Sequence, residues 1–261
     1  MKSLYVAGQN SETREWVPVA ELRKVTDGFQ LRYTQGARRL PGFSGLSRMN
    51  DLDKIYFSES LFPFFSNRLI PKSRPEFKSY LNWLGLTELP ESPLEMLAVS
   101  GGVRATDNYE IFTMPEPTEK KFSFDFFPRG MRHQTEAVQR EIHQLSFGNE
   151  VFLMKDFQNP KDKNALAIRT EKPSALLIGY VPRYYAHALH RLLNIDEKSV
   201  RGEIKRVSPD APQDLRVLVT LYVAAPASFN FLAESTDFDC VSDSENAGAR
   251  SELIQNTSLD I

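Results

Sequence analysis

The chain has very little cysteine: Cys240 is the only one among its 261 residues. A single thiol excludes a disulfide within the chain and any zinc site built mainly from cysteines. No apolar run approaches the ~20 residues of a membrane-spanning helix, and the N-terminus has no long apolar core of the signal-peptide kind. These absences predict a cytoplasmic protein that has no membrane partner.

Catalytic motifs are equally scarce. No motif ties a serine, a histidine and an aspartate into a nucleophile–base–orienter set. The pair Gly101-Gly102 lacks the rest of a phosphate-binding loop and more simply ends a helix. His187 and His190 lie one helical turn apart, which permits a metal, but nothing nearby completes a ligand set. We therefore expect a binding protein, not an enzyme, with no metal and no cofactor.

The net charge of −2 conceals a gradient along the chain. Residues 1–120 hold 15 Lys+Arg and 15 Asp+Glu, residues 121–223 hold 16 and 12, and residues 224–261 hold 1 and 7. The positive excess of the middle part suits a phosphate-bearing partner but is too small to identify nucleic acid by itself.

The first 118 residues mix strand and helix patterns, which predicts an α+β arrangement. Strands are expected over 4–8, 16–22, 28–33 and 109–114, and in the third of these Phe29, Leu31 and Tyr33 alternate with polar residues. Residues 35–50 are rich in Gly and Arg and predict a loop. Apolar residues at helical spacing predict a helix capped by Ser58 and ended by Pro71, a second helix over 73–84, and a third opened by the capping box at Ser92.

Residues 115–120 read as a linker, after which the pattern becomes mostly that of strands. Phe122, Phe124 and Phe126 alternate with polar residues, and residues 134–147 fit a helix. The remaining strands are expected near 151–157, 166–168, 175–178, 200–207 and 215–223, with a helix over 184–193. Residues 234–261 are acidic and lack periodicity, so we expect a disordered tail.

Three separated motifs mark the second half of the chain. They are Gly130-Met131-Arg132-His133, then Asn159-Pro160-Lys161-Asp162-Lys163-Asn164-Ala165, then Gly179-Tyr180-Val181-Pro182-Arg183. In this order the three motifs make residues 122–223 resemble the HIRAN domain. The resemblance implies an OB-like β-barrel domain over 122–225 that binds single-stranded DNA at a free 3′ end.

The same resemblance implies one pocket around the three motifs. It assigns Arg132 and Lys161 to phosphate, and His133 and Tyr180 to stacking on or bonding the terminal nucleotide. Arg183 begins a helix beside the same site, where it could contact backbone phosphate. Asp162 would accept a hydrogen bond from the 3′-OH and would repel a 3′-phosphate. Two positions depart from the usual family pattern, because Lys161 stands where an aromatic residue is common and His133 where tyrosine is more usual.

Blander interpretations of these residues stay open at this point. Asp162 and Asn164 can bond their own backbone, and in the alternative interpretation they serve only to cap the turn. Arg183 opens a helix, where an exposed arginine is usually solvated.

Residues 1–118 resemble the small N-terminal subdomain of HipA-like toxin kinases. The resemblance rests on the segment from Phe64 to Pro71, which reads FFSNRLIP, and on the later Gly101-Gly102. The kinase domain that follows in that family is absent from this sequence, together with its catalytic-loop motif. The resemblance therefore implies a protein-interaction role for this part and no kinase activity.

Two functions of different class remain. The first is a DNA-binding adaptor, in which the HIRAN-like part reads single-stranded 3′ ends and residues 1–118 recruit a protein partner, with DNA repair as one setting. The second is a purely protein-interacting regulator related to toxin–antitoxin systems. A hydrolase acting on nucleic-acid ends has less support, because no metal–carboxylate cluster is visible.

Overall fold

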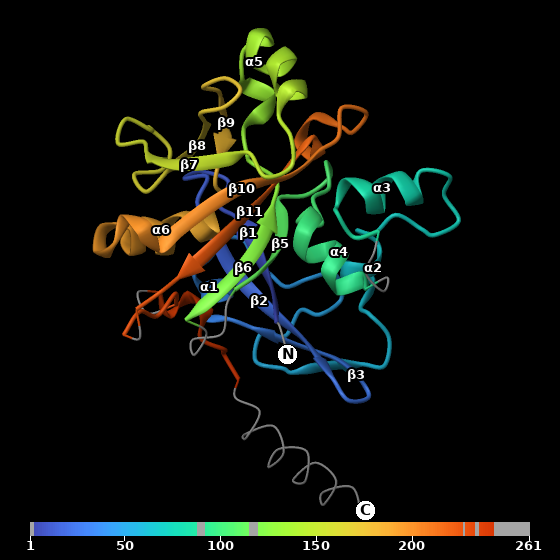
Figure 1. Ribbon diagram of the computed structural model, residues 1–261. Coiled ribbons are helices and arrows are strands. Elements are labelled where there is room, and N and C mark those ends of the chain that lie inside the picture. The colour runs from blue at the N-terminus through green and yellow to red at the C-terminus, as the bar shows by residue number, and fades with distance from the viewer. Residues whose placement is uncertain (1–2, 88–91, 115–119, 227, 233–234, 243–261) are drawn as a thin grey trace, which may run out of the picture. The chain divides into compact units, whose positions relative to one another are not determined.

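The computed structural model describes residues 3–87, 92–114, 120–226, 228–232 and 235–242 (Figure 1). Contacts divide the chain into two compact units. Unit 1 comprises residues 1–68, 104–114 and 232–261, and unit 2 comprises residues 69–103 and 115–231. Each unit is a mixture of helices with one antiparallel sheet, which confirms the α+β class.

Unit 1 is organised around a five-stranded sheet in the order β4-β3-β2-β1-β5. In the central strands, residues 4–8 of β1 and 17–22 of β2 are buried, as their nearly continuous apolar residues favour. The strands predicted near 4–8, 16–22, 28–33 and 109–114 are all confirmed. Their bounds are β1 Leu4–Gln9, β2 Trp16–Val25, β3 Gly28–Tyr33, β4 Tyr56–Ser58 and β5 Tyr109–Thr113.

Two local predictions in unit 1 are wrong. Ser58 does not cap a helix: it ends β4, where it pairs with Phe29 of β3, and the helix α2 is only Pro63–Ser66. The expected loop over 35–50 begins instead with a short helix, α1 Gln35–Arg39. In both places a partner distant in sequence decides the local structure over its propensity.

Part of the predicted disordered tail is ordered. Residues 235–242 include the 3₁₀ helix η5 Thr236–Phe238 and the bridge between Cys240 and Thr34. The Phe238 ring packs edge-on against Tyr5, with 5.3 Å between ring centroids. The tail expectation is therefore wrong for these residues, and the rest of it, from residue 243, lies outside the described residues together with position 234.

Unit 2 holds a six-stranded antiparallel sheet in the order β6-β11-β10-β7-β8-β9 (Figure 1). The end strands β6 and β9 share no ladder among the described residues, so the expected barrel is not closed by continuous pairing. In the part of the chain that the structure describes, a single bridge, Arg129↔Tyr180, joins the segment just after β6 to β9. The strand bounds are β6 Lys121–Phe126, β7 Glu150–Lys155, β8 Leu166–Thr170, β9 Leu177–Tyr180, β10 Val200–Val207 and β11 Val217–Ala224.

Helix α6, Arg183–Ile195, is the longest helix among the described residues. It buries Tyr185, Ala188, Leu189 and Leu192, the face that helical spacing predicts. The other helical elements of unit 2 are short. They are α3 Phe77–Trp83, α4 Pro93–Ser100, η1 Met131–His133, α5 Glu136–Glu141, η2 Ile142–Gln144, η3 Glu197–Ser199 and η4 Gln213–Leu215.

Helices α3 and α4 belong to the core of unit 2. Leu84 and Met96 join one apolar cluster with Phe127 and Leu218, which flank or lie in the sheet. Helix α4 begins as its capping box predicts, because the Ser92 hydroxyl accepts the Glu95 N–H at 3.3 Å. The predicted HipA N-terminal-like domain over 1–118 stays a prediction, and so do the boundaries at 118 and 122, since the linker residues 115–119 are not described. No helix among the described residues is long and apolar enough to cross a membrane.

Candidate functional site

The turn between β7 and β8 is held by its own side chains. The Asn159 side-chain oxygen accepts the backbone N–H of Lys161 at 3.0 Å and of Asp162 at 3.1 Å. The Asp162 Oδ1 accepts the N–H of Asn164 at 2.9 Å, and the N–H of Ala165 donates to the Asp162 carbonyl at 3.0 Å. The spacing of the Asn-Pro-x-Asp-x-Asn motif is therefore the spacing of two successive side-chain caps.

Asp162 does more than cap the turn. Its second oxygen, Oδ2, lies 3.4 Å from Nε of Arg183, at the start of α6. The Asp162 side chain is 16% exposed and that of Arg183 is 29% exposed, so a ligand atom can still reach the pair. Pro182 occupies the N-cap position directly before Arg183. Because the proline ring restricts the φ angle of Pro182, this residue favours the start of α6 at Arg183.

Tyr180 is tied to the same turn through a residue that sequence reasoning missed. Its hydroxyl donates to Oδ2 of Asp156 at 3.0 Å, and the Asn159 amide donates to the same oxygen at 3.4 Å. Burial raises the pKa of Tyr180, and the neighbouring Asp156 carboxylate raises it further. The phenol therefore remains protonated at neutral pH and keeps its hydrogen bond to Asp156.

Tyr180 also takes part in the backbone bridge between β9 and the segment that follows β6. The Arg129 N–H donates to the Tyr180 carbonyl at 2.8 Å, and the Tyr180 N–H donates back at 2.9 Å. Gly179 makes this approach possible: a Cβ there would lie 2.7 Å from the Arg129 carbonyl oxygen, and its φ of +143° is one that favours glycine. The glycine of the Gly-Tyr-Val-Pro-Arg motif thus has a steric cause.

Arg132 and His133 lie close in sequence to the bridge between Arg129 and Tyr180. They lie in η1, a few residues past Arg129, and both are exposed. The Arg132 Nε donates to His133 Nε2 at 3.3 Å, which leaves the rest of the guanidinium facing solvent. Lys161 is exposed at the tip of the turn.

The six predicted residues are therefore linked to different degrees. Direct contacts join Asp162 to Arg183, and Tyr180 to the turn by way of Asp156. The segment of Arg132 and His133 is connected to Tyr180 through the backbone bridge at Arg129.

Two residues outside the prediction complete the cluster. Asp156 holds Tyr180, and the only sequence signal for it is its position just before the Asn-Pro turn, where it accepts the N–H of Gln158. Arg129 donates from its guanidinium to the Tyr184 hydroxyl at 3.4 Å. No sequence pattern marks Arg129, because its partner lies 55 residues away.

The charges suit a small anionic ligand. Arg129, Arg132, Lys161 and Arg183 supply positive charge, and Asp156 and Asp162 supply acceptors for hydroxyl groups. Within the described ranges no group of three His, Cys, Asp or Glu side chains could hold a metal ion. The chemistry that this cluster offers is recognition of a ligand that bears both phosphate and hydroxyl.

Comparison with known proteins agrees with part of this description. A crystal structure of a protein from Lactobacillus plantarum covers 40% of this chain and 96% of its own length, with 20% identity and a TM-score of 0.30. The crystal structure of the HIRAN domain of human HLTF covers 45% of this chain and 85% of its own length, with 18% identity and a TM-score of 0.30. Comparison with curated proteins gives no match. The family model of the HIRAN domain matches residues 121–225, which confirms a HIRAN domain in this part of the chain.

Proposed function

We propose that the HIRAN domain of this chain binds the 3′ end of single-stranded DNA and that the chain acts as an adaptor without enzymatic activity. The observation that carries the proposal is the Asp162 carboxylate, held by the turn with one oxygen and offered beside Arg183 with the other. The match to the HIRAN domain over 121–225 supports nucleic acid as the partner.

The role of each residue follows from its surroundings. Asp162 accepts the hydrogen bond of a terminal 3′-OH, and Arg183 balances its charge and contacts the adjacent phosphate. Tyr180 offers a ring face near the terminal base, and the exposed His133 a second one. Arg132 and Lys161, which are exposed, neutralise backbone phosphates.

The adaptor role further requires a protein partner, which we assign to residues 1–118. The alternative, a regulator that binds only proteins, predicts that the same chain has no affinity for DNA. The two functions are separated by one direct binding measurement.

That measurement is fluorescence anisotropy with short labelled single strands at one stated salt concentration. We compare a free 3′-OH, a 3′-phosphate and a blunt duplex. We expect the free 3′-OH to bind most tightly, because a phosphate at that position meets the Asp162 carboxylate. Equal binding of all three would reduce the interaction to a general electrostatic contact, and no binding would favour the regulator.

Asp162→Asn is the sharpest variant. The amide oxygen can still cap the turn, while the negative charge is gone, so folding is preserved. A hydrogen bond to a charged group contributes about 1.5–3 kcal/mol, so we expect the preference for 3′-OH over 3′-phosphate to fall by about 10- to 100-fold. Asp196→Asn is the matched control, because Asp196 caps η3 in the same way, accepting the Lys198 N–H at 2.9 Å, outside the cluster.

A further inference from the structure

Strand β7 is paired very differently along its two edges. On one side it pairs with β8 without interruption, from Val151↔Thr170 to Lys155↔Leu166. On the other side its register with β10 holds only Glu150↔Glu203 and Val151↔Gly202. Among the described residues, β7 therefore has no ladder partner beyond Val151 on the β10 side.

The free edge presents specific backbone groups. The N–H of Asp156 donates to the Ala165 carbonyl on the β8 side. In an antiparallel ladder successive residues direct their N–H and C=O groups to opposite sides. The backbone groups of Leu153 and Lys155 therefore point away from β8, toward the place where β10 has diverged.

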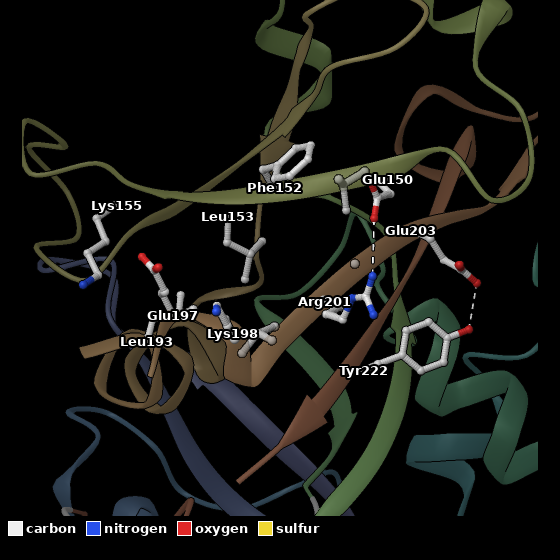
Figure 2. Close-up of a pocket in the computed structure, with 13 residues that line it drawn as sticks. Glu150, Phe152, Leu153, Lys155, Leu193, Glu197, Lys198, Arg201, Glu203 and Tyr222 are labelled. Carbon is white, nitrogen blue, oxygen red and sulfur yellow. Dashed lines mark hydrogen bonds and ion pairs between the residues drawn. The ribbon is translucent and has the colours of Figure 1, made fainter. Parts of the chain in front are cut away.

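A cavity of about 960 Å³ opens at this divergence, between β7, β10 and the end of α6 (Figure 2). Leu153 points into it from β7, and Leu193 and Val200 line it from α6 and β10. Phe152, which is 42% exposed, lies at its rim. The cavity thus combines an apolar floor with an unpaired strand edge.

Its two ends carry opposite charge. Lys155 and Lys198, with Glu197, lie at one end, and Glu150 and Glu203, with Arg201, lie at the other (Figure 2). Arg201 Nη2 lies 3.6 Å from Glu150, and the Tyr222 hydroxyl donates to Glu203 at 2.7 Å. A polyanion would meet net negative charge at the second end, whereas a peptide can present an acid to the first end and a base to the second.

We propose that this groove binds an extended peptide segment of a partner protein as an added strand, antiparallel to β7. Its N–H and C=O groups pair with those of Leu153 and Lys155, and one apolar side chain packs on Leu153. The antiparallel direction places the start of the peptide near Lys155 and its end near Glu150. The segment therefore has an acidic residue first, apolar residues at alternate positions, and a basic residue last.

The test uses the full chain and two synthetic peptide libraries, capped at both ends and about six residues long, the usual length of a strand. In one library glutamate is fixed first and lysine last, and in the other the order is reversed. We expect binders from the first library only. N-methylation of the amides that face β7 should abolish their binding, because it removes the donors of the added strand.

Two variants on neighbouring positions of β7 separate the groove from the rest of the surface. Leu153→Lys places a charge on the apolar floor and should weaken the selected peptides at least about tenfold, which is 1.4 kcal/mol. Met154→Lys is the control: Met154 is the next residue, is 46% exposed and does not line the groove. Amide exchange of Leu153 and Lys155 should slow when peptide binds, a readout that a merely structural change would not give.

Several outcomes would overturn the proposal. It fails if both libraries yield binders equally, if neither does, or if Leu153→Lys folds normally by circular dichroism and leaves binding unchanged. It also fails if a single-stranded oligonucleotide displaces the peptides and loses affinity in Leu153→Lys, since the groove would then belong to nucleic acid. The 3′-end site is tested separately, by Asp162→Asn.

Discussion

Each of the two sheets carries a glutamate–arginine pair across neighbouring strands, and the pairs differ in their exposure. In unit 1, Glu21 of β2 pairs with Arg32 of β3 at 2.6 Å, with side chains 1% and 7% exposed. In unit 2, Glu150 of β7 lies 3.6 Å from Arg201 of β10, with side chains 67% and 79% exposed. The pair of Glu21 and Arg32 is buried within the continuous ladder of β2 and β3. The pair of Glu150 and Arg201 lies where the ladder between β7 and β10 ends.

The surroundings of Glu21 show what burial of a carboxylate requires. Burial alone would raise the pKa of Glu21, but hydrogen bonds from Arg23, Ser3 and Arg32 outweigh burial and hold the pKa below its ordinary 4.5. Glu150 has no comparable set of partners among the described residues. A continuous ladder can thus bury a carboxylate that accepts several hydrogen bonds, while an interrupted ladder leaves its charges available to a partner.

The largest expected difference between the units comes from deleting the two glutamates. Glu21→Ala leaves Arg32 as a buried, uncompensated charge and should cost about 3–5 kcal/mol. Glu150→Ala should cost no more than about 1 kcal/mol, because both partners are solvated. Urea denaturation can read each unit separately, since Trp16 lies in β2 of unit 1 and Trp83 in α3 of unit 2.

The pH dependence of unit 1 provides the control for this prediction. The folded pKa of Glu21 is lowered, so its stabilisation is present above pH 4.5 and is lost as the pH falls through the folded value. In a Trp83→Phe background, Glu21→Gln should show a smaller loss of stability on acidification than the parent. Equal acid sensitivity would contradict the buried pair.

The second prediction concerns residues 235–242, which pack within unit 1. Arg39 donates to both oxygens of Asp237, at 2.8 and 2.6 Å, and burial raises the pKa of the Cys240 thiol to about 11. We expect slow alkylation of Cys240 at pH 8 in the native chain. Arg39→Ala should speed the reaction about fivefold, if the paired contact contributes about 1 kcal/mol.

Arg48→Ala is the matched control for this experiment, because Arg48 is an exposed arginine of the same unit. Rapid alkylation of the unaltered chain would mean that residues 235–242 are not held on unit 1.

The smallest expected effect concerns His190 of α6. Burial lowers the pKa of His190, Lys155 and His187 lower it further, and Asp162 opposes them. The Phe157 ring packs edge-on against the imidazole, with 6.2 Å between ring centroids. The unfolded chain therefore binds the proton more readily, and unit 2 should lose stability as the pH falls below 6.5.

His190→Gln should reduce this slope slightly without changing stability at pH 8. Trp83 fluorescence in a Trp16→Phe background provides the measurement. An unchanged slope between pH 7.5 and 5.5 would show that His190 is solvated in both states.

Sequence patterns predicted the elements whose causes are local. The alternation of Phe122, Phe124 and Phe126 predicted β6, and the Ser92 cap predicted the start of α4. The predicted cap by the Asp162 side chain is confirmed, whereas the second cap of this turn comes from Asn159 and was not predicted.

The failures have distant causes. Ser58 joins a strand because Phe29 is available to pair with it, and residues 235–242 are ordered by contacts with Arg39 and Tyr5. The divergence of β7 and β10 has no sequence signal either. It depends on where a long-range ladder ends, which no window of the sequence contains.

The bridge between Arg129 and Tyr180 links β9 to the segment that follows β6 in the HIRAN domain. Opening this bridge breaks two backbone hydrogen bonds, whereas opening the ladder between β7 and β8 separates five residue pairs, so local opening at the bridge costs less than opening that ladder. A ligand that contacts both Tyr180 and the segment after Arg129 binds only while this bridge is formed. Ligand binding and opening of the bridge are then linked equilibria: bound ligand favours the formed bridge, and opening of the bridge weakens ligand binding.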